Sequence, residues 1–204
     1  VCARACDRKC EHRCNLGMSG GESIAIRALK RFVVDQVDPA VYKPNITARN
    51  GKDKIKVAII GAGPAGLSAA HCLSLSGYKV TVFEAEKEPG GMLISSLPAY
   101  RLPQQVVRKE IQSLLNQNIT LKCESVLGRD VNLDDLFNDG FKAVFLAIGA
   151  HSSWPLNLEG EDVKGVYPSI NFLKAFNLHG EEWARGHVGI VGGGNSAVDA
   201  ARVA

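Results

Sequence analysis

Short apolar runs and helically spaced apolar positions alternate along the middle of the chain. Continuous apolar runs are typical of buried strands, and apolar positions three or four residues apart are typical of amphipathic helices. By these patterns we expect strands at residues 56–60, 79–83, 119–123 and 142–148. We expect helices at residues 67–75, 104–116 and 170–178. Strands that alternate with helices predict an α/β domain with a parallel sheet and flanking helices.

A glycine pattern joins the first expected strand to the first expected helix, and we call it the first fingerprint: Gly61-Ala62-Gly63-Pro64-Ala65-Gly66. In this pattern the first glycine permits a tight turn, the second lets the backbone approach a pyrophosphate, and the third lets the helix pack on the strand. Glu84 follows the second strand, 23 residues after Gly61, where an acidic partner for a ribose hydroxyl is expected. Strand, loop, helix, strand and acid together predict a dinucleotide site.

The second fingerprint is Gly192-Gly193-Gly194-Asn195-Ser196-Ala197, which follows an apolar run at 188–191 and begins 131 residues after the first. Two such loops suggest two dinucleotides, with electrons passed between them. The helix that we expect from Asn195 reaches Ala204 too early to complete a βαβ unit, which needs about 30 residues or more. We therefore expect a fragment of a longer protein, truncated at the start of a second dinucleotide-binding domain.

The first fifty residues form a different module, which begins with four cysteines at a strict four-residue spacing: Cys2, Cys6, Cys10 and Cys14. A close run of thiolates beside a flavin-type domain favours an iron–sulfur cluster. A zinc site and a disulfide knot are the alternatives, although zinc usually uses two separated cysteine pairs and disulfides are rare in reducing compartments. An amphipathic helix with an outward basic face is expected at 24–32.

Composition and turn residues divide the chain and exclude several classes of function. Prolines and glycine near residue 50 mark a linker, so we expect a cysteine-rich helical segment at 1–50, a dinucleotide-binding domain at 51–186 and the start of another at 187–204. The 24 Lys and Arg nearly balance the 21 Asp and Glu, and no basic stripe indicates nucleic acid. We see no apolar run of membrane-spanning length and no signal peptide, and expect a cytoplasmic protein.

Few side chains are candidates for direct catalysis. His71, His151 and His179 are isolated, and we interpret them as structural or surface residues. A reductase that uses a redox disulfide would need two neighbouring cysteines, whereas Cys72 and Cys123 are 51 residues apart. Electron transfer between cofactors needs the protein to position them rather than to supply a nucleophile or base. We therefore predict no catalytic side chain.

Seven motifs together resemble the small-subunit family of NADPH-dependent glutamate synthase and its relatives, over essentially the whole chain. The most specific motif is Pro98-Ala99-Tyr100-Arg101-Leu102-Pro103. The others are the cysteine run, the two fingerprints and the segments at 26–32, 90–93 and 147–150.

This resemblance implies a small helical domain with [4Fe–4S] clusters, then a Rossmann-like FAD domain interrupted by an NADPH domain. By matching position, residues 62–66 would hold the FAD pyrophosphate and Glu84 its ribose. Around the flavin nucleotide would lie Gly91, Met92, Arg101, Val126, Ala147 and Gly149. The NADPH site would begin at Gly192, Gly194, Asn195, Ser196 and Ala197. The cluster ligands would be Cys2, Cys6, Cys10 and Cys14.

The resemblance also implies a route for electrons. NADPH would reduce the flavin, and electrons would leave singly through iron–sulfur clusters to a larger catalytic subunit or another redox partner protein. Family members usually carry further cluster cysteines before this run, and Asp7 stands where proline is common in the family. The alternative function is an electron-relay or docking module without turnover of its own, serving a larger dehydrogenase complex.

Overall fold

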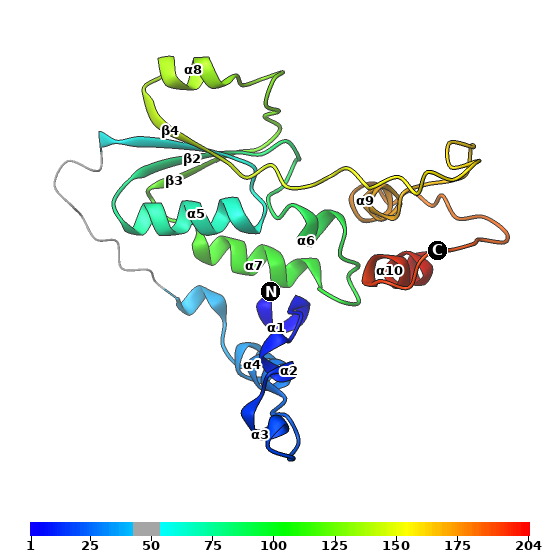
Figure 1. Ribbon diagram of the computed structural model, residues 1–204. Helices are drawn as coiled ribbons and strands as arrows, with labels where there is room; N and C mark the ends of the chain where they lie inside the picture. Colours follow the sequence, from blue (N-terminus) through cyan, green and yellow to red (C-terminus); the bar gives the residue numbers. More distant parts are fainter. Residues whose placement is uncertain (43–53) are drawn as a thin grey trace.

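The computed structural model describes residues 1–42 and 54–204, shown in Figure 1. Within these residues, a parallel sheet consists of β1 (Lys56–Ile60), β2 (Lys79–Phe83), β3 (Ile119–Lys122) and β4 (Phe141–Leu146). The strands lie in the order β3-β2-β1-β4. Ile60, the last residue of β1, pairs with Phe83 and Leu146, so neighbouring strands end at the same edge. The four expected strands and the α/β fold are confirmed.

Helices cover both faces of this sheet (Figure 1). The helices α5 (Pro64–Leu75) and α7 (Gln104–Leu114) lie on one face, and α8 (Leu133–Asn138) lies on the other. The larger core cluster, on the first face, contains Ile59, Val80, Val82, Leu67, Ala70, Val107 and Ile111. The smaller cluster contains Ala58, Ile60, Phe83, Leu136 and Phe141. Successive residues of β1 thus enter opposite cores, as the alternation of side chains along a strand requires.

The cysteine-rich segment folds into short helices beside α7 (Figure 1). These are α1 (Cys2–Ala5), α2 (Lys9–His12), α3 (Asn15–Met18), α4 (Ile26–Asp35) and the 3₁₀ turn η1 (Pro39–Val41). Arg4 pairs with Asp35 at 2.6 Å, and the amino terminus of Val1 pairs with Glu110 of α7. The expected helix at 24–32 is therefore present as α4, displaced toward the carboxyl terminus. The described residues do not include Pro44, Asn50 or Gly51, which belong to the expected linker.

Three further helices complete the described part of the chain. The short helix α6 (Met92–Ser95) lies next to α7, and α9 (Ser169–His179) and α10 (Asn195–Val203) pack together at the right of Figure 1. The expected helices at 170–178 and from Asn195 are thus confirmed. The apolar run at 188–191 forms no strand, although it precedes the second fingerprint. A strand needs a neighbour for its backbone hydrogen bonds, and no described strand pairs with this run. None of the described helices has the length and apolar character needed to cross a membrane.

Candidate dinucleotide-binding site

The first fingerprint lies where β1 and β4 end, which is where ligands bind in parallel α/β sheets. Gly61 has a φ of +103°, a conformation that favours glycine. A side chain at Gly61 would also overlap the carbonyl oxygen of Ala147, the residue that follows β4. Ala147 in turn donates its backbone N–H to the carbonyl of Ile60 at 2.8 Å. The structure thus places Ala147 directly against the fingerprint turn.

Gly66 brings α5 into close contact with this turn. A Cβ atom at Gly66 would overlap the carbonyl oxygen of Gly61 and lie 3.2 Å from the Cγ2 atom of Ile59. The helix begins with Pro64, whose missing N–H has no cost at the first helical position. Glycine at position 66 is therefore required by the protein's own packing, because any larger residue would push the helix off the strand.

Gly63 differs from both of these glycines. Its φ of −73° and ψ of −178° are open to any residue. The nearest atom to a Cβ built there is the Cα of Gly91, at 4.0 Å, which is an ordinary contact. Neither strain nor packing in the protein explains a glycine at this position. The open space lies at the amino-terminal end of α5, where unpaired N–H groups and the helix dipole favour an anion.

A second loop, at residues 90–92, borders the same space. Gly90 donates its N–H to the carbonyl of Ala62 at 2.9 Å. Gly91 has a φ of +54°, and a Cβ there would lie 2.9 Å from the Cα of Gly63. Met92 starts the short helix α6 directly afterwards. The structure therefore places Gly91 against the first fingerprint, with Met92 next to it in the chain. Their contacts with a cofactor stay predictions.

Glu84 joins the fingerprint to the end of β2. Its residue is 6% exposed, and its carboxylate accepts the N–H of Ala62 at 2.6 Å and the N–H of Glu86 at 3.0 Å. One carboxylate oxygen thus holds the fingerprint loop and the other holds the turn after β2. This bracing was not part of the sequence prediction, and it places Glu84 at the expected edge of the site. Its contact with a ribose stays a prediction.

Replacing Glu84 with glutamine should destabilise the flavin-free protein, because an amide NH₂ would face either the buried N–H of Ala62 or the partly buried N–H of Glu86. Leaving such a group without an acceptor costs about 1–3 kcal/mol. Urea unfolding followed by circular dichroism measures the free energy of unfolding. Glu159→Gln, in an exposed loop, is the matched control. Equal free energies of unfolding for both variants and the unaltered chain would show that the bracing is unimportant.

The side chain of Arg101 binds a residue outside the first fingerprint. Its Nη2 lies 2.6 Å and its Nε 3.0 Å from Oδ1 of Asp199, which lies on α10. The carboxylate of Asp199 raises the pKa of the Arg101 guanidinium above its already high value. Sequence reasoning singled out Arg101 but missed Asp199, because an acidic residue within a helix carries no signal of a partner 98 residues away. A cofactor contact of Arg101 stays a prediction.

Two other predicted residues lie in turns after the outer strands. Val126 follows β3; its N–H donates to Oδ2 of Asp130 at 2.9 Å, and its carbonyl accepts the N–H of Asp130, also at 2.9 Å. Gly149 follows β4 with a φ of +73°, and the carbonyl of the adjoining Ile148 contacts Nε2 of His151 at 2.9 Å. Both turns follow the carboxyl ends of their strands, the edge at which ligands bind in parallel α/β sheets. No feature of either turn identifies a nucleotide contact, so both assignments remain predictions.

The second fingerprint is an open loop that leads into α10 beside α9 (Figure 1). Gly192 has a φ of +115°, and Gly194 stands directly before the helix. A Cβ at Gly193 or Gly194 would meet no atom within 4 Å. The residues from Asn195 to Ala197 form the first turn of α10. The loop therefore has the turn and helix of a nucleotide site, but no described strand behind it.

The predicted cysteine ligands lie on separate short elements. Cys6 ends α1, Cys10 lies in α2, and Cys14 precedes α3, while the side chain of Cys2 is outside the description. Hydrogen bonds from the backbone N–H groups of Ile24 above all, and of Gly17 and Leu16, lower the pKa of the Cys14 thiol. Among the side chains that the structure describes, no three metal-binding groups gather around one point. The described thiols therefore do not form a closed metal site by themselves.

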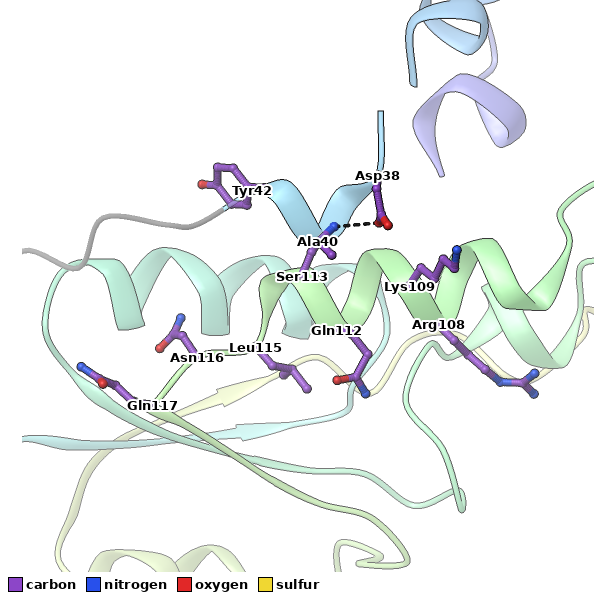
Figure 2. A pocket seen from close by; sticks show the side chains of 10 residues that line it. All are labelled: Asp38, Ala40, Tyr42, Arg108, Lys109, Gln112, Ser113, Leu115, Asn116 and Gln117. Carbon is purple, nitrogen blue, oxygen red and sulfur yellow. Dashed lines mark hydrogen bonds between the residues drawn. The ribbon is translucent and has the colours of Figure 1, made fainter. Parts of the chain in front are cut away.

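A separate pocket lies between η1 and α7, as Figure 2 shows. Its volume is about 660 Å³, and its lining includes Tyr42, Arg108 and Gln112. At its rim, Oδ1 of Asp38 accepts the N–H of Ala40 at 3.0 Å. None of the residues predicted to bind a cofactor or metal lines this pocket. It is therefore distinct from the fingerprint site at the edge of the sheet.

Comparisons with known proteins identify the family and support the fold. The family model described as pyridine nucleotide-disulphide oxidoreductase matches residues 55–204. The NADP(+)-dependent formate dehydrogenase subunit beta of Moorella thermoacetica is 39% identical, over 100% of this chain and 32% of that protein. The glutamate synthase (NADPH) small chain of Escherichia coli is 36% identical, over 99% of this chain and 45% of that protein. The chain thus spans less than half the length of these two relatives.

Comparison with solved structures also supports the fold. Mycobacterium tuberculosis FprA in complex with NADPH aligns with a TM-score of 0.56 and 25% identity, over 61% of this chain and 29% of that one. A 2-naphthoyl-CoA reductase aligns with a TM-score of 0.58 and 22% identity, over 81% of this chain and 23% of that one, which supports the fold alone. The resemblance to the glutamate synthase small-subunit family is therefore confirmed by the relatives that match the whole chain.

Proposed function

We propose, because this chain belongs to the pyridine nucleotide-disulphide oxidoreductase family, that it is the flavin-binding part of an enzyme that moves electrons from NADPH to FAD. The observation that carries the proposal is Gly63, which neither the backbone nor the packing of the protein requires. A pyrophosphate lying over α5 would require it. Relatives that are named for NADPH or NADP support the choice of the electron donor.

The residues around the first fingerprint fit an FAD pyrophosphate. Leu67 donates the first hydrogen bond of α5, to the carbonyl of Gly63 at 3.0 Å, so helix geometry directs the earlier N–H groups of Ala65 and Gly66 toward a bound anion. The 90–92 loop closes one side, and Glu84 fixes the turn through its hydrogen bond with Ala62. We propose that the Glu84 carboxylate also contacts the ribose. FAD, when bound, accepts a hydride and releases electrons singly. The protein's part is to bind and orient the nucleotide.

The second fingerprint is proposed to begin the NADPH site. Gly192 makes the turn, and Gly194, Asn195, Ser196 and Ala197 lead into the first turn of α10, which would face the donor's phosphates. The open surroundings of Gly193 and Gly194 leave space for a ligand backbone to approach. If this loop bound nothing, Gly193 and Gly194 would have no role, because only Gly192 is explained by its positive φ.

The cysteine run is proposed to supply ligands to a [4Fe–4S] cluster. Its even spacing and the amide hydrogen bonds that favour the thiolate of Cys14 support this assignment. Because the described thiols do not enclose a site, we propose that Cys2 and further ligands complete it. Such a cluster would carry single electrons away from the flavin-binding part.

The partner is proposed to be a catalytic subunit or another redox protein. Relatives that match the whole chain are named as beta subunits or small chains, which supports a partner but does not identify it. The same observation favours the second candidate function, an electron-relay or docking module without turnover of its own.

One experiment tests the proposal and separates the two functions. NADPH is added without oxygen to the flavin-loaded full-length protein, first alone and then with an artificial electron acceptor. We expect flavin reduction in the first step and continuous acceptor reduction in the second. Flavin reduction without turnover would favour the relay module. A flavin that NADPH leaves oxidised would refute both.

A further inference from the structure

A buried carboxylate connects the two fingerprint-bearing parts of the chain. Asp199 lies on α10, which follows the second fingerprint, and its residue is only 3% exposed. Its Oδ1 atom accepts hydrogen bonds from the hydroxyl of Tyr100 and from the guanidinium of Arg101. Both donors lie in the loop at residues 98–103, between α6 and α7. Three donor groups from one loop thus converge on a single oxygen of another part of the chain.

A second residue of α10 also contacts Tyr100. The guanidinium carbon of Arg202, one turn further along α10, lies 3.7 Å from the centre of the Tyr100 ring. A cation over an aromatic face at this distance is attractive. Burial and the neighbouring Asp199 carboxylate both raise the pKa of the Tyr100 phenol, which keeps its proton available for donation. The hydroxyl of Tyr100 is therefore bound to the Asp199 carboxylate, while the face of its ring contacts the Arg202 cation.

The 98–103 loop does not need α10 in order to keep its own shape. The amides of Arg101 and Leu102 both donate to the carbonyl of Pro98, at 3.0 and 3.1 Å. Leu102 is completely buried in the larger core cluster. Tyr100 and Arg101 are left as outward-directed groups on a loop that is already fixed. Their common partner is Asp199 on α10.

This junction completes a continuous path between the fingerprints. Gly63 of the first fingerprint lies against Gly91, which begins α6. The loop that follows α6 holds Asp199, and Asp199 lies two residues after the second fingerprint. The helix α6 also packs on α9, through a hydrogen bond from Nδ2 of Asn177 to the carbonyl of Ser95 at 3.1 Å. Each step is a direct contact or a short stretch of the chain.

We propose that Tyr100, Arg101 and Asp199 form a latch that sets the position of α10, and with it the nicotinamide site, relative to the flavin site. The proposal rests on the proposed function for its catalytic consequence, because only two bound nucleotides need a fixed relative position. Hydride transfer depends steeply on alignment, and a displacement of about 1 Å can slow an enzyme by about a hundredfold. The three residues are positioning residues that act through the placement of α10.

The first test compares Tyr100→Phe, Asp199→Asn and the double variant in the flavin-loaded full-length protein. We expect each single variant to slow flavin reduction by saturating NADPH by about tenfold or more. The double variant should be no slower than Asp199→Asn, because groups that share one interaction are not additive. Asp134→Asn, on α8 at the opposite face of the sheet, is the control and should leave the rate unchanged. Unchanged rates in Asp199→Asn, or additive losses in the double variant, would overturn the proposal.

The second test does not need NADPH or electron transfer. Amide hydrogen exchange across α10 should be faster in Asp199→Asn than in the unaltered flavin-free protein, while exchange across β1 and β2 should be unchanged. Equal exchange across α10 would overturn the latch, as would acceleration throughout the sheet, which would indicate general destabilisation. If the unaltered protein fails to be reduced by NADPH, the proposed function fails, and the exchange measurement still decides whether the latch exists.

Discussion

Gly66→Ala is expected to unfold or severely destabilise the flavin-binding unit. Alanine has the higher helix propensity, which alone would favour the variant by about 1 kcal/mol. The added methyl group would, however, overlap the carbonyl oxygen of Gly61, and backbone cannot move aside as a flexible side chain can. Overpacking costs about 1–3 kcal/mol and occasionally more, and we expect an overlap with rigid backbone to lie at the upper end of this range. Urea unfolding and expression in soluble form measure the effect, and an unchanged midpoint would contradict this description of the fingerprint.

Gly63→Ala is the matched variant and should behave in the opposite way. Its backbone conformation suits alanine, and the nearest atom to the new methyl group would be 4.0 Å away. We expect normal folding but an FAD dissociation constant raised by at least about tenfold, which corresponds to about 1.4 kcal/mol. Fluorescence titration with FAD measures this constant. A variant that folds and binds FAD normally would show that the space at Gly63 is not a pyrophosphate site.

Cys10→Ala in the full-length protein is expected to remove one cluster, with the loss of about four iron atoms and about four acid-labile sulfides per chain. Cys10 is exposed on α2, so its truncation should not disturb the fold. Iron and sulfide are measured on protein prepared without oxygen. We expect the rate of flavin reduction by NADPH to change little, because the cluster lies after the flavin in the proposed route.

Cys72→Ala is the control for this substitution, since Cys72 is also exposed but lies on α5, outside the cysteine run. Its iron and sulfide should equal those of the unaltered protein. Zinc without sulfide in the unaltered protein would overturn the cluster assignment. Full iron content in Cys10→Ala would show that this residue is not a ligand.

Much of the fold could be predicted because burial and sequence pattern coincide in the central strands. Four of the five residues of β1 are buried, so its uninterrupted apolar run is a direct signal. The turn after β1 could also be predicted, because Gly61 has a positive φ and Gly66 lies against the carbonyl of Gly61, a neighbour in the sequence. Such local requirements can be recognised from the sequence alone.

The remaining features depend on contacts between distant segments. The run at 188–191 has the composition of a strand but lacks a partner strand among the described residues, and a strand is defined by pairing rather than by composition. Asp199 becomes important only through a loop 98 residues earlier, and Glu84 braces two loops in addition to its expected position. Spacing along the chain cannot reveal such contacts, because they arise from the packing of elements that form independently.

The most direct test of the central claim is the addition of NADPH, without oxygen, to the flavin-loaded full-length protein while the flavin absorbance is recorded. We predict that about one equivalent of NADPH bleaches the flavin, because a hydride carries the two electrons that FAD accepts. Dithionite provides the control, since it reduces a competent flavin without using the nicotinamide site. An absorbance that dithionite bleaches but excess NADPH leaves unchanged would contradict the proposed transfer from NADPH to FAD.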